Sequence, residues 1–244
     1  MTFREPVLEV KNVCKFFGGI KALDDISLSL FDGELVGVIG PNGSGKTTLI
    51  NVITGYIKPD KGSVICMGKD ITGLPPHEAV SMGIVRTFQI TRPFKELSVL
   101  SNVMLSVLFR ERNVEKAREI ALNILKWFNL EDKKDLMCKD LNIPDQKKIE
   151  FARALALDPK ILLMDEVLAG LHIEDAKRIL DIIRKLREER KITILIVEHR
   201  VKLLAEIVDR MIAMNAGRII AEGSSSDVLN NPEVIKVYLG EGYK

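Results

Sequence analysis

Residues 40–47 are the sequence feature that most constrains this chain. They read Gly-Pro-Asn-Gly-Ser-Gly-Lys-Thr, which fits the pattern of a glycine, four residues and Gly-Lys-Ser/Thr. In such a loop several backbone N–H groups converge on phosphates, Lys46 reaches the outer phosphates and Thr47 offers a hydroxyl to Mg²⁺. A strand-like run over 34–39 precedes the loop and a helical run over 46–54 follows it. We expect a nucleoside triphosphate site formed by Gly40, Pro41, Asn42, Gly43, Ser44, Gly45, Lys46, Thr47 and Thr48.

Composition limits the remaining classes of function. The 244 residues are enough for one large α/β domain or a core with a small subdomain, and we favour the second. A net charge of +2 gives no basic excess of the size that nucleic-acid binding needs, so we expect no nucleic-acid partner. No apolar run approaches the roughly 18 residues of a membrane span, and residues 1–6 lack a signal-peptide pattern. We expect a soluble, intracellular protein.

The order of strand-like and helical patterns predicts an α/β fold. Residues 7–39 contain three β-like runs separated by turn signals, and we interpret them as a β-rich lobe. Over 99–140 the apolar spacing changes to three and four, which indicates an inserted helical subdomain. A helix follows over 144–157, with Pro144 in the first helical position. The helical subdomain is either a docking surface or a solvated bundle without a partner.

An acid pair ends the buried strand predicted at 161–164. Asp165, at the carboxyl end of that strand, is placed to hold Mg²⁺ through water, and Glu166 is placed to polarise an attacking water. A short apolar run followed by Asp-Glu is common by itself. Its position a little over a hundred residues after a phosphate-binding loop makes the catalytic interpretation the better one.

Two further polar residues follow predicted strands. His199 comes after the strand at 192–197, so it should emerge at the sheet edge where residues 40–48 and Asp165 emerge. An imidazole at this edge can bond the γ-phosphate and the attacking water. Gln89 follows the strand-like run at 83–88, and its amide can approach Mg²⁺ and water. We therefore expect Thr47, Asp165 and Gln89 around the metal.

These motifs, in this order, resemble the ABC-type ATPases over nearly the whole chain. The resemblance implies the P-loop NTPase fold of that family, with an antiparallel β lobe and an α-helical subdomain. It implies that Phe17 stacks on adenine, that Gln89 senses the γ-phosphate and the membrane partner, and that Glu166 and His199 are catalytic. It implies a RecA-like nucleotide-binding core with the β lobe over 1–92 and 157–244, and a helical subdomain over 93–156. ATP and Mg²⁺ are the expected cofactors.

A narrower resemblance concerns the LivG-type subunits of branched-chain amino-acid importers. It depends on residues 17–25, 83–89, 198–200, 221–223 and 232–234. This resemblance implies import of branched-chain or other amino acids, in a dimer that holds two ATP molecules between its subunits. It also implies transmembrane permease partners, indirectly a substrate-binding protein, and a peripheral position on the inner face of the cell membrane.

The chain departs from the family pattern at the signature loop. The family's Leu-Ser-Gly-Gly-Gln falls on residues 141–145, and only the leucine is retained. Pro144 has no N–H, Ile143 is bulky where glycine allows close approach, and Asp145 adds a negative charge. Asn142 can still donate a side-chain hydrogen bond. The expected signature loop, acting on the partner's ATP, is Leu141, Asn142, Ile143, Pro144 and Asp145.

Two changes lie where the dimer seam is expected. Val167 replaces the usual proline after the catalytic glutamate, and His172 replaces an aspartate or asparagine. Our hypothesis is a different partner ATPase and two unequal composite sites, the weaker one using this chain's signature loop. A homodimer with a divergent but working signature loop is the alternative.

Two other functions compete with transport. One is a soluble ABC-type ATPase acting as a regulatory or mechanical module, which would predict a second cassette or a long coiled-coil insertion, and the chain has neither. The other is a phosphotransferase, for which no acceptor-binding segment is recognisable. Transport remains the preferred interpretation.

Overall fold

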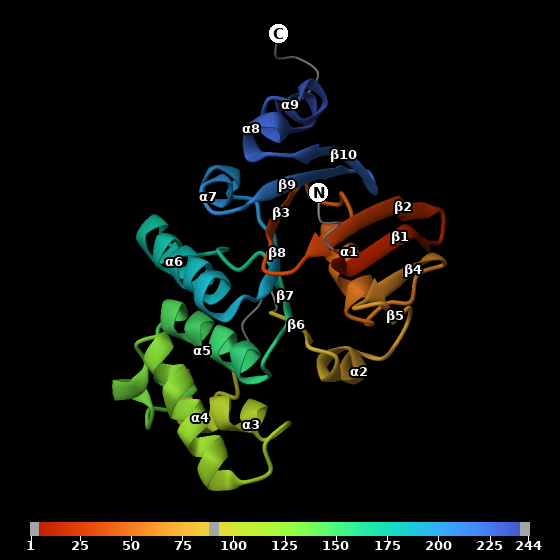
Figure 1. The fold of residues 1–244 in the computed structure, drawn as a ribbon. Helices are drawn as coiled ribbons and strands as arrows, with labels where there is room; N and C mark the ends of the chain where they lie inside the picture. The colour runs from red at the N-terminus through yellow and green to blue at the C-terminus, as the bar shows by residue number, and fades with distance from the viewer. Residues whose placement is uncertain (1–4, 88–92, 240–244) are drawn as a thin grey trace.

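The computed structural model describes residues 5–87 and 93–239, and its strands form two sheets (Figure 1). Strand order is β10-β9-β3-β8-β7-β6 in the larger sheet and β2-β1-β4-β5 in the smaller one. The strands are β1 (Pro6–Phe17), β2 (Ile20–Phe31), β3 (Leu35–Ile39), β4 (Lys61–Cys66), β5 (Lys69–Asp70), β6 (Ile84–Arg86), β7 (Ile161–Asp165), β8 (Thr193–Val197), β9 (Arg210–Asn215) and β10 (Arg218–Gly223).

The larger sheet, called the central sheet below, positions the predicted site. Strands β9, β3, β8, β7 and β6 are parallel, and β10 pairs antiparallel to β9. Parallel neighbours bring the carboxyl ends of β3, β7 and β8 to one edge. Residues 40–48, Asp165 and His199 follow directly at that edge, as the sequence predicted.

The smaller antiparallel sheet (β1, β2, β4 and β5) is the β lobe, on the right in Figure 1. Its first two strands are longer than predicted, because β1 and β2 continue to a tight turn at Gly18-Gly19. The third β-like run, residues 34–39, was also predicted to belong to the β lobe. That prediction was wrong, because the strand it forms, β3, belongs to the central sheet. All five residues of β3 are buried, as expected of a strand covered on both faces.

The helices lie around the central sheet. The 3₁₀ turns are Glu131–Lys133 and Cys138–Asp140. The α-helices are α1 (Lys46–Ile53), α2 (Pro76–Ser81), α3 (Val99–Val107), α4 (Val114–Trp127), α5 (Ile143–Ala156), α6 (Ile173–Arg190), α7 (Val201–Ala205), α8 (Ser225–Leu229) and α9 (Pro232–Leu239).

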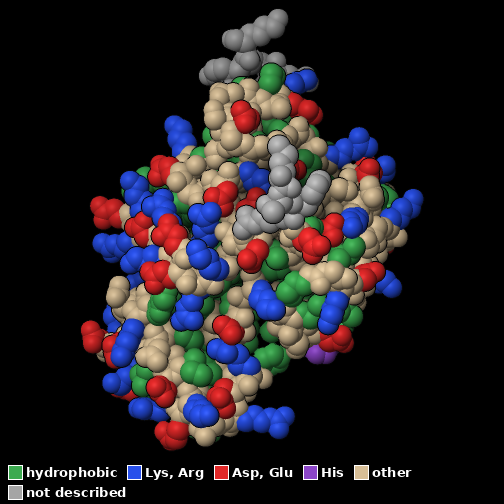
Figure 2. All heavy atoms as spheres, viewed as in Figure 1, with side chains coloured by type: hydrophobic (Ala, Val, Ile, Leu, Met, Phe, Trp, Pro, Cys, Tyr) green, Lys and Arg blue, Asp and Glu red, His purple; other side chains and the backbone are tan. Residues whose placement is uncertain are grey.

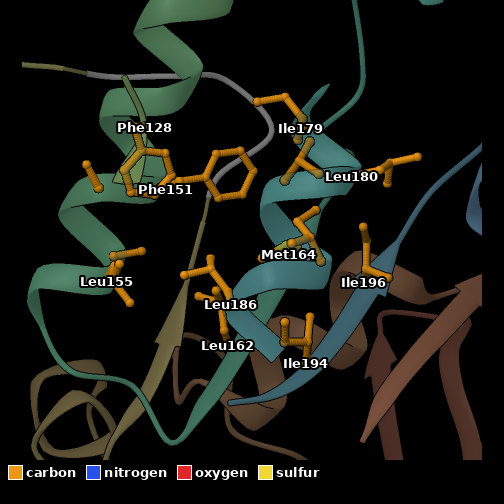
Figure 3. Packing of buried hydrophobic residues seen from close by; sticks show 14 of the residues in the cluster. Phe128, Phe151, Leu155, Leu162, Met164, Ile179, Leu180, Leu186, Ile194 and Ile196 are labelled. Carbon is orange, nitrogen blue, oxygen red and sulfur yellow. The ribbon is translucent and has the colours of Figure 1, made fainter. Parts of the chain in front are cut away.

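Alternating residues of the central strands enter two separate cores. In β7, Leu162 and Met164 belong to the cluster formed with α3–α6, while Ile161 and Leu163 belong to the cluster formed with α1 and the β lobe. Figure 3 shows the first cluster, with Leu162, Met164, Ile194 and Ile196 near Ile179 and Leu186 of α6. This alternation follows from the period of two along a strand, and it fixes the register of β7 and β8.

Helices α3, α4 and α5 form the lower part of the molecule in Figure 1. The buried face of α4 consists of Ala117, Ala121, Ile124 and Leu125, as its apolar spacing predicted. Helix α5 begins at Ile143 rather than at Pro144, because the Asn142 side chain caps it. Acidic and basic side chains are interspersed over the face seen in Figure 2. Within the described ranges, no helix combines the length and apolarity needed to cross a bilayer.

Candidate active site

Two glycines in the loop between β3 and α1 leave no room for a side chain. A Cβ on Gly40 would lie 2.3 Å from the Met214 carbonyl oxygen and 2.6 Å from Ser44 Oγ. Gly45 caps α1 with a φ of 105°, and a Cβ there would lie 2.4 Å from the Ala22 carbonyl oxygen. These contacts explain why the loop requires glycine at both positions. They place the N-terminus of α1 at the sheet edge, where its free N–H groups can receive phosphates.

The Lys46 side chain lies inside this loop. Its Nζ donates hydrogen bonds to the carbonyls of Gly40 and Pro41, both at 2.8 Å, and to Ser44 Oγ at 3.3 Å. Burial lowers the pKa of the Lys46 ammonium, and the carboxylates of Glu166 and Asp165 oppose that change. The loop therefore holds a cation in place where the outer phosphates are expected.

Asp165 lies beside the start of α1 and is 2 % exposed. Its Oδ1 is 3.4 Å from the Thr47 hydroxyl, and its Oδ2 is 3.6 Å from a guanidinium nitrogen of Arg86. Burial raises the pKa of Asp165, while Arg86 and the Thr47 hydrogen bond oppose this effect. A carboxylate and a hydroxyl side by side are hard oxygen donors of the kind Mg²⁺ prefers. These two residues fit the expected metal.

Glu166 and His199 are in direct contact. His199 Nε2 lies 2.8 Å from Glu166 Oε1, so the imidazole and the carboxylate share a hydrogen bond. Glu166 has a φ of 50°, a conformation that costs free energy for any residue except glycine. Such strain is maintained only when the neighbours of a residue fix it, and it is common at functional sites.

A surface cleft of about 680 Å³ connects these groups. Its floor is the loop and the start of α1, one wall is Glu166 with His199, and the other wall is the apolar turn between β1 and β2. Phe17 is 47 % exposed and Ile20 is 71 % exposed, so both offer apolar surface to a flat ring. The lining residues are Phe17, Ile20, Ala22, Asn42, Gly43, Gly45, Lys46, Thr47, Thr48, Glu166 and His199.

The structure brings together most, but not all, of the predicted site residues. Three residues of the loop accept hydrogen bonds from Lys46 and do not line the cleft, namely Gly40, Pro41 and Ser44. Gln89 lies outside the described residues. Residues 141–145 do not line the cleft of their own chain, and their role toward a partner's nucleotide stays a prediction.

The signature segment, residues 141–145, is occupied by contacts within the chain. The Asn142 Oδ1 accepts the Asp145 N–H at 2.8 Å and caps α5, whereas the donor predicted for a partner's nucleotide is the other end of this amide, the Nδ2 group. The Asp145 carboxylate is buried and pairs with Lys133 and with Lys148, the latter at 3.0 Å. Burial alone would raise the pKa of Asp145, but the hydrogen bonds from these lysines outweigh it and lower that pKa. Ile143 is 61 % exposed.

Sequence reasoning missed three charged residues near the site, the half-buried Arg86 and the buried Glu198 and Lys147. Arg86 contacts Asp165 and donates a 2.5 Å hydrogen bond to Asn51 of α1. Glu198 and Lys147 bond the backbone after Glu166. Their positions in the sequence could have revealed two of them. Arg86 is the last residue of β6, the strand beside β7, and Glu198 directly precedes His199.

Two known protein families match the sequence of this chain. Residues 23–169, more than half of the chain, match the ABC transporter family. The chain belongs to the ABC transporter family. It is one of the ATP-binding subunits of that family and an ATPase. Residues 218–244 match a second family, described as branched-chain amino acid ATP-binding cassette transporter.

Individual relatives of this ABC ATPase align over nearly all of their own length. The "Probable branched-chain amino acid transport ATP-binding protein LivG" of Archaeoglobus fulgidus is 39 % identical, with 96 % of this chain and 95 % of the relative covered. The ADP conformation of an ATP-binding cassette of an ABC transporter has a TM-score of 0.88 at 39 % identity, covering 97 % of this chain and 100 % of that one. A dimeric post-hydrolysis cassette bound to ADP and Pi has a TM-score of 0.80 at 30 % identity, covering 89 % and 98 %.

Proposed function

We propose that this chain is the LivG-type subunit of an importer of branched-chain amino acids. The observation that supports this most strongly is the match of residues 218–244 to a family of branched-chain amino acid transporters, in addition to the ABC match over 23–169. The full-length similarity to a transport subunit favours transport over a soluble mechanical ATPase. The amino acid itself would be selected by permease and binding-protein subunits.

The cleft suits ATP in one orientation. Phe17 and Ile20 offer apolar surface for adenine, and an aromatic ring stacked on a base contributes about 1–3 kcal/mol in comparable sites. Residues 40–48 would surround the phosphates with backbone N–H groups. Lys46 would exchange the loop carbonyls it now bonds for the β- and γ-phosphates. The nucleotide would thus join the β lobe to the central sheet.

Mg²⁺ would be held by Thr47, by Asp165 through water, and by Gln89. When bound, the metal neutralises phosphate charge during phosphoryl transfer. Glu166 would accept a proton from the attacking water, because its carboxylate lies at the cleft and is 17 % exposed at the side chain. His199 would orient Glu166 through their hydrogen bond and would bond the γ-phosphate. These residues would promote hydrolysis by positioning the attacking water and by stabilising the charge on the γ-phosphate.

A groove beside Arg86 is the proposed docking site for the permease. Its volume is about 460 Å³, and it lies between α3, α5, β6 and the segment after α1. Arg86 lies over the Tyr56 ring at 5.3 Å, and Arg153 lies over the Phe94 ring at 4.7 Å. These aromatic and cationic side chains suit a helix end with a polar and an apolar face. Docking here would place the chain peripherally on the inner face of the membrane.

The proposed boundary between the nucleotide-binding core and the helical subdomain runs along the same groove. The nucleotide-binding core with the β lobe would consist of 1–92 and 157–244, and the helical subdomain of 93–156. Helices α3–α5 pack on one another and also share a hydrophobic cluster with α6 and the central sheet. A hinge at these boundaries would let ATP binding at one side move the docked permease at the other.

The ATP assignment is tested by Lys46→Ala. A charged hydrogen bond to phosphate contributes about 1.5–3 kcal/mol, so ATP affinity should fall at least about tenfold and ATP-driven leucine uptake should stop. Titration with a fluorescent ATP analogue and uptake into vesicles containing the complete transporter measure both. Lys177→Ala, on the exposed face of α6, is the matched control. Wild-type affinity in the Lys46 variant would reject the site.

A further inference from the structure

One peptide group next to Glu166 is held from both sides by charged side chains. The N–H of Leu168 donates to Glu198 Oε1 at 2.6 Å. The carbonyl oxygen of Val167 accepts from Lys147 Nζ at 2.9 Å. Both backbone groups belong to the peptide that joins residues 167 and 168. We call Lys147, Glu198 and this peptide the peptide clamp.

Both charged side chains of the peptide clamp are buried. Glu198 is 2 % exposed and Lys147 is 6 % exposed. Burying a charged group is unfavourable unless hydrogen bonds compensate for the lost water. Here the compensation comes from hydrogen bonds to the backbone and from the attraction between the two opposite charges, so moving either side chain away from the 167–168 peptide would cost free energy. The two come from different elements, Lys147 from α5 and Glu198 from the segment after β8.

The peptide clamp forms a closed ring with the catalytic pair. The chain runs from Glu166 to the 167–168 peptide, which bonds Glu198. Glu198 is followed by His199, whose Nε2 returns to Glu166 Oε1 at 2.8 Å. Glu166 also has the unfavourable φ of 50°. A displacement of the peptide would therefore move the Glu166 carboxylate relative to His199.

We propose that Lys147 and Glu198 are positioning residues that hold the 167–168 peptide, keep Glu166 on His199, and transmit the position of α5 to Glu166. Lys147 lies on the second turn of α5, the helix that begins directly after Asn142. A partner that shifts this helix end would move Lys147 and with it the backbone next to Glu166. The inference rests on the proposed roles of Glu166 and His199.

The test uses the full-length chain with Glu198→Ala, Lys147→Ala and the double variant. Misplacing a catalytic group by about 1 Å costs up to about a hundredfold in rate, so kcat for ATP should fall about ten- to a hundredfold. The affinity for ATP should stay within about twofold, because residues 40–48 are unchanged. The double variant should lose little more than the worse single variant, since both side chains hold one peptide.

A conservative variant and a control separate positioning from general stability. Glu198→Gln keeps an oxygen for the Leu168 N–H and should fold if the alanine variant does not. In Glu198→Ala, which removes that acceptor, hydrogen exchange should increase over residues 166–171 only. Glu34→Gln is the control, because Glu34 also accepts a backbone N–H (Phe31, 3.0 Å) and pairs with an arginine, at the other end of β3. It should lower stability without changing kcat.

Several results would overturn the peptide clamp. Wild-type kcat in Glu198→Ala, fully additive losses in the double variant, or an equal kcat loss in Glu34→Gln would each do so. An increase in hydrogen exchange over the whole chain of the Glu198 variant would also overturn it. If wild-type protein fails to bind or hydrolyse ATP, the proposed function fails instead. In that case the exchange data alone decide the peptide clamp, so the two failures are distinguishable.

Discussion

At the scale of the residue, burial makes the charge of Glu198 depend on pH. Burial raises the pKa of its carboxyl from 4.5 to about 6, against the hydrogen bonds from Leu168 and His199 that favour the ionised form. Between these two values the folded state binds more protons than the unfolded state. The free energy of unfolding contributed by Glu198 should therefore decrease as the pH rises through this range, by about 2 kcal/mol in total from well below the lower value to well above the upper one.

Glu198→Gln tests this dependence because glutamine does not titrate. Between pH 4.5 and 6 the free energy of unfolding of the wild type should fall by about 1.3 kcal/mol relative to that of the variant. Urea unfolding at several pH values measures the difference. If the free energy of unfolding depended on pH in the same way in both proteins, the pKa of the Glu198 carboxyl would not be raised by folding. Glu34→Gln provides the comparison, because Glu34 is a carboxylate that also accepts a backbone N–H, at the opposite end of β3.

At the scale of the element, Asn142 is the N-cap of α5. Its side chain accepts the Asp145 N–H, which would otherwise lack an intrahelical partner. Asn142→Ala should lower the free energy of unfolding by about 1 kcal/mol. Asn142→Ser should retain most of that stability, because a serine hydroxyl is also a good cap. Thermal or urea unfolding of both variants measures this, and equal losses would contradict a capping role.

At the scale of the whole molecule, the groove between α3 and α5 should connect the ATPase to its permease. Ser106 is half-buried in this groove, and Ser106→Trp would fill it with a large ring. The variant should no longer fractionate with membranes that contain the permease, because the docking site is blocked. Binding of ATP should be unchanged, since no residue that lines the groove also lines the nucleotide cleft. Normal co-fractionation would reject this docking site.

The second prediction at this scale concerns the two composite ATP sites. In the signature segment Asn142 and Asp145 already have partners within the chain, and Pro144 has no N–H. The site that uses this segment should therefore be the weaker one. With a different partner ATPase, Glu166→Gln in this chain should reduce turnover more than the equivalent change in the partner. Equal losses would indicate two equivalent sites.

Much of the site could be predicted from the sequence because short-range geometry defines it. The spacing of glycines, Lys46 and Thr47 specifies a loop before any tertiary contact forms. An acid pair or histidine after an apolar run lies at the end of a strand for the same local reason. The prediction failed for β3, because a short apolar run does not reveal which sheet a strand joins.

What the sequence determined, then, is the loop, the strand ends and the amphipathic helices, since each depends on neighbours a few residues apart. Tertiary structure decided which distant side chains meet. Lys147, Val167 and Glu198 are separated by 20 and 31 residues in sequence, yet they meet on one peptide because α5 and β8 pack against β7. No periodicity encodes such a contact. It arises only when parallel strands and their covering helices are assembled.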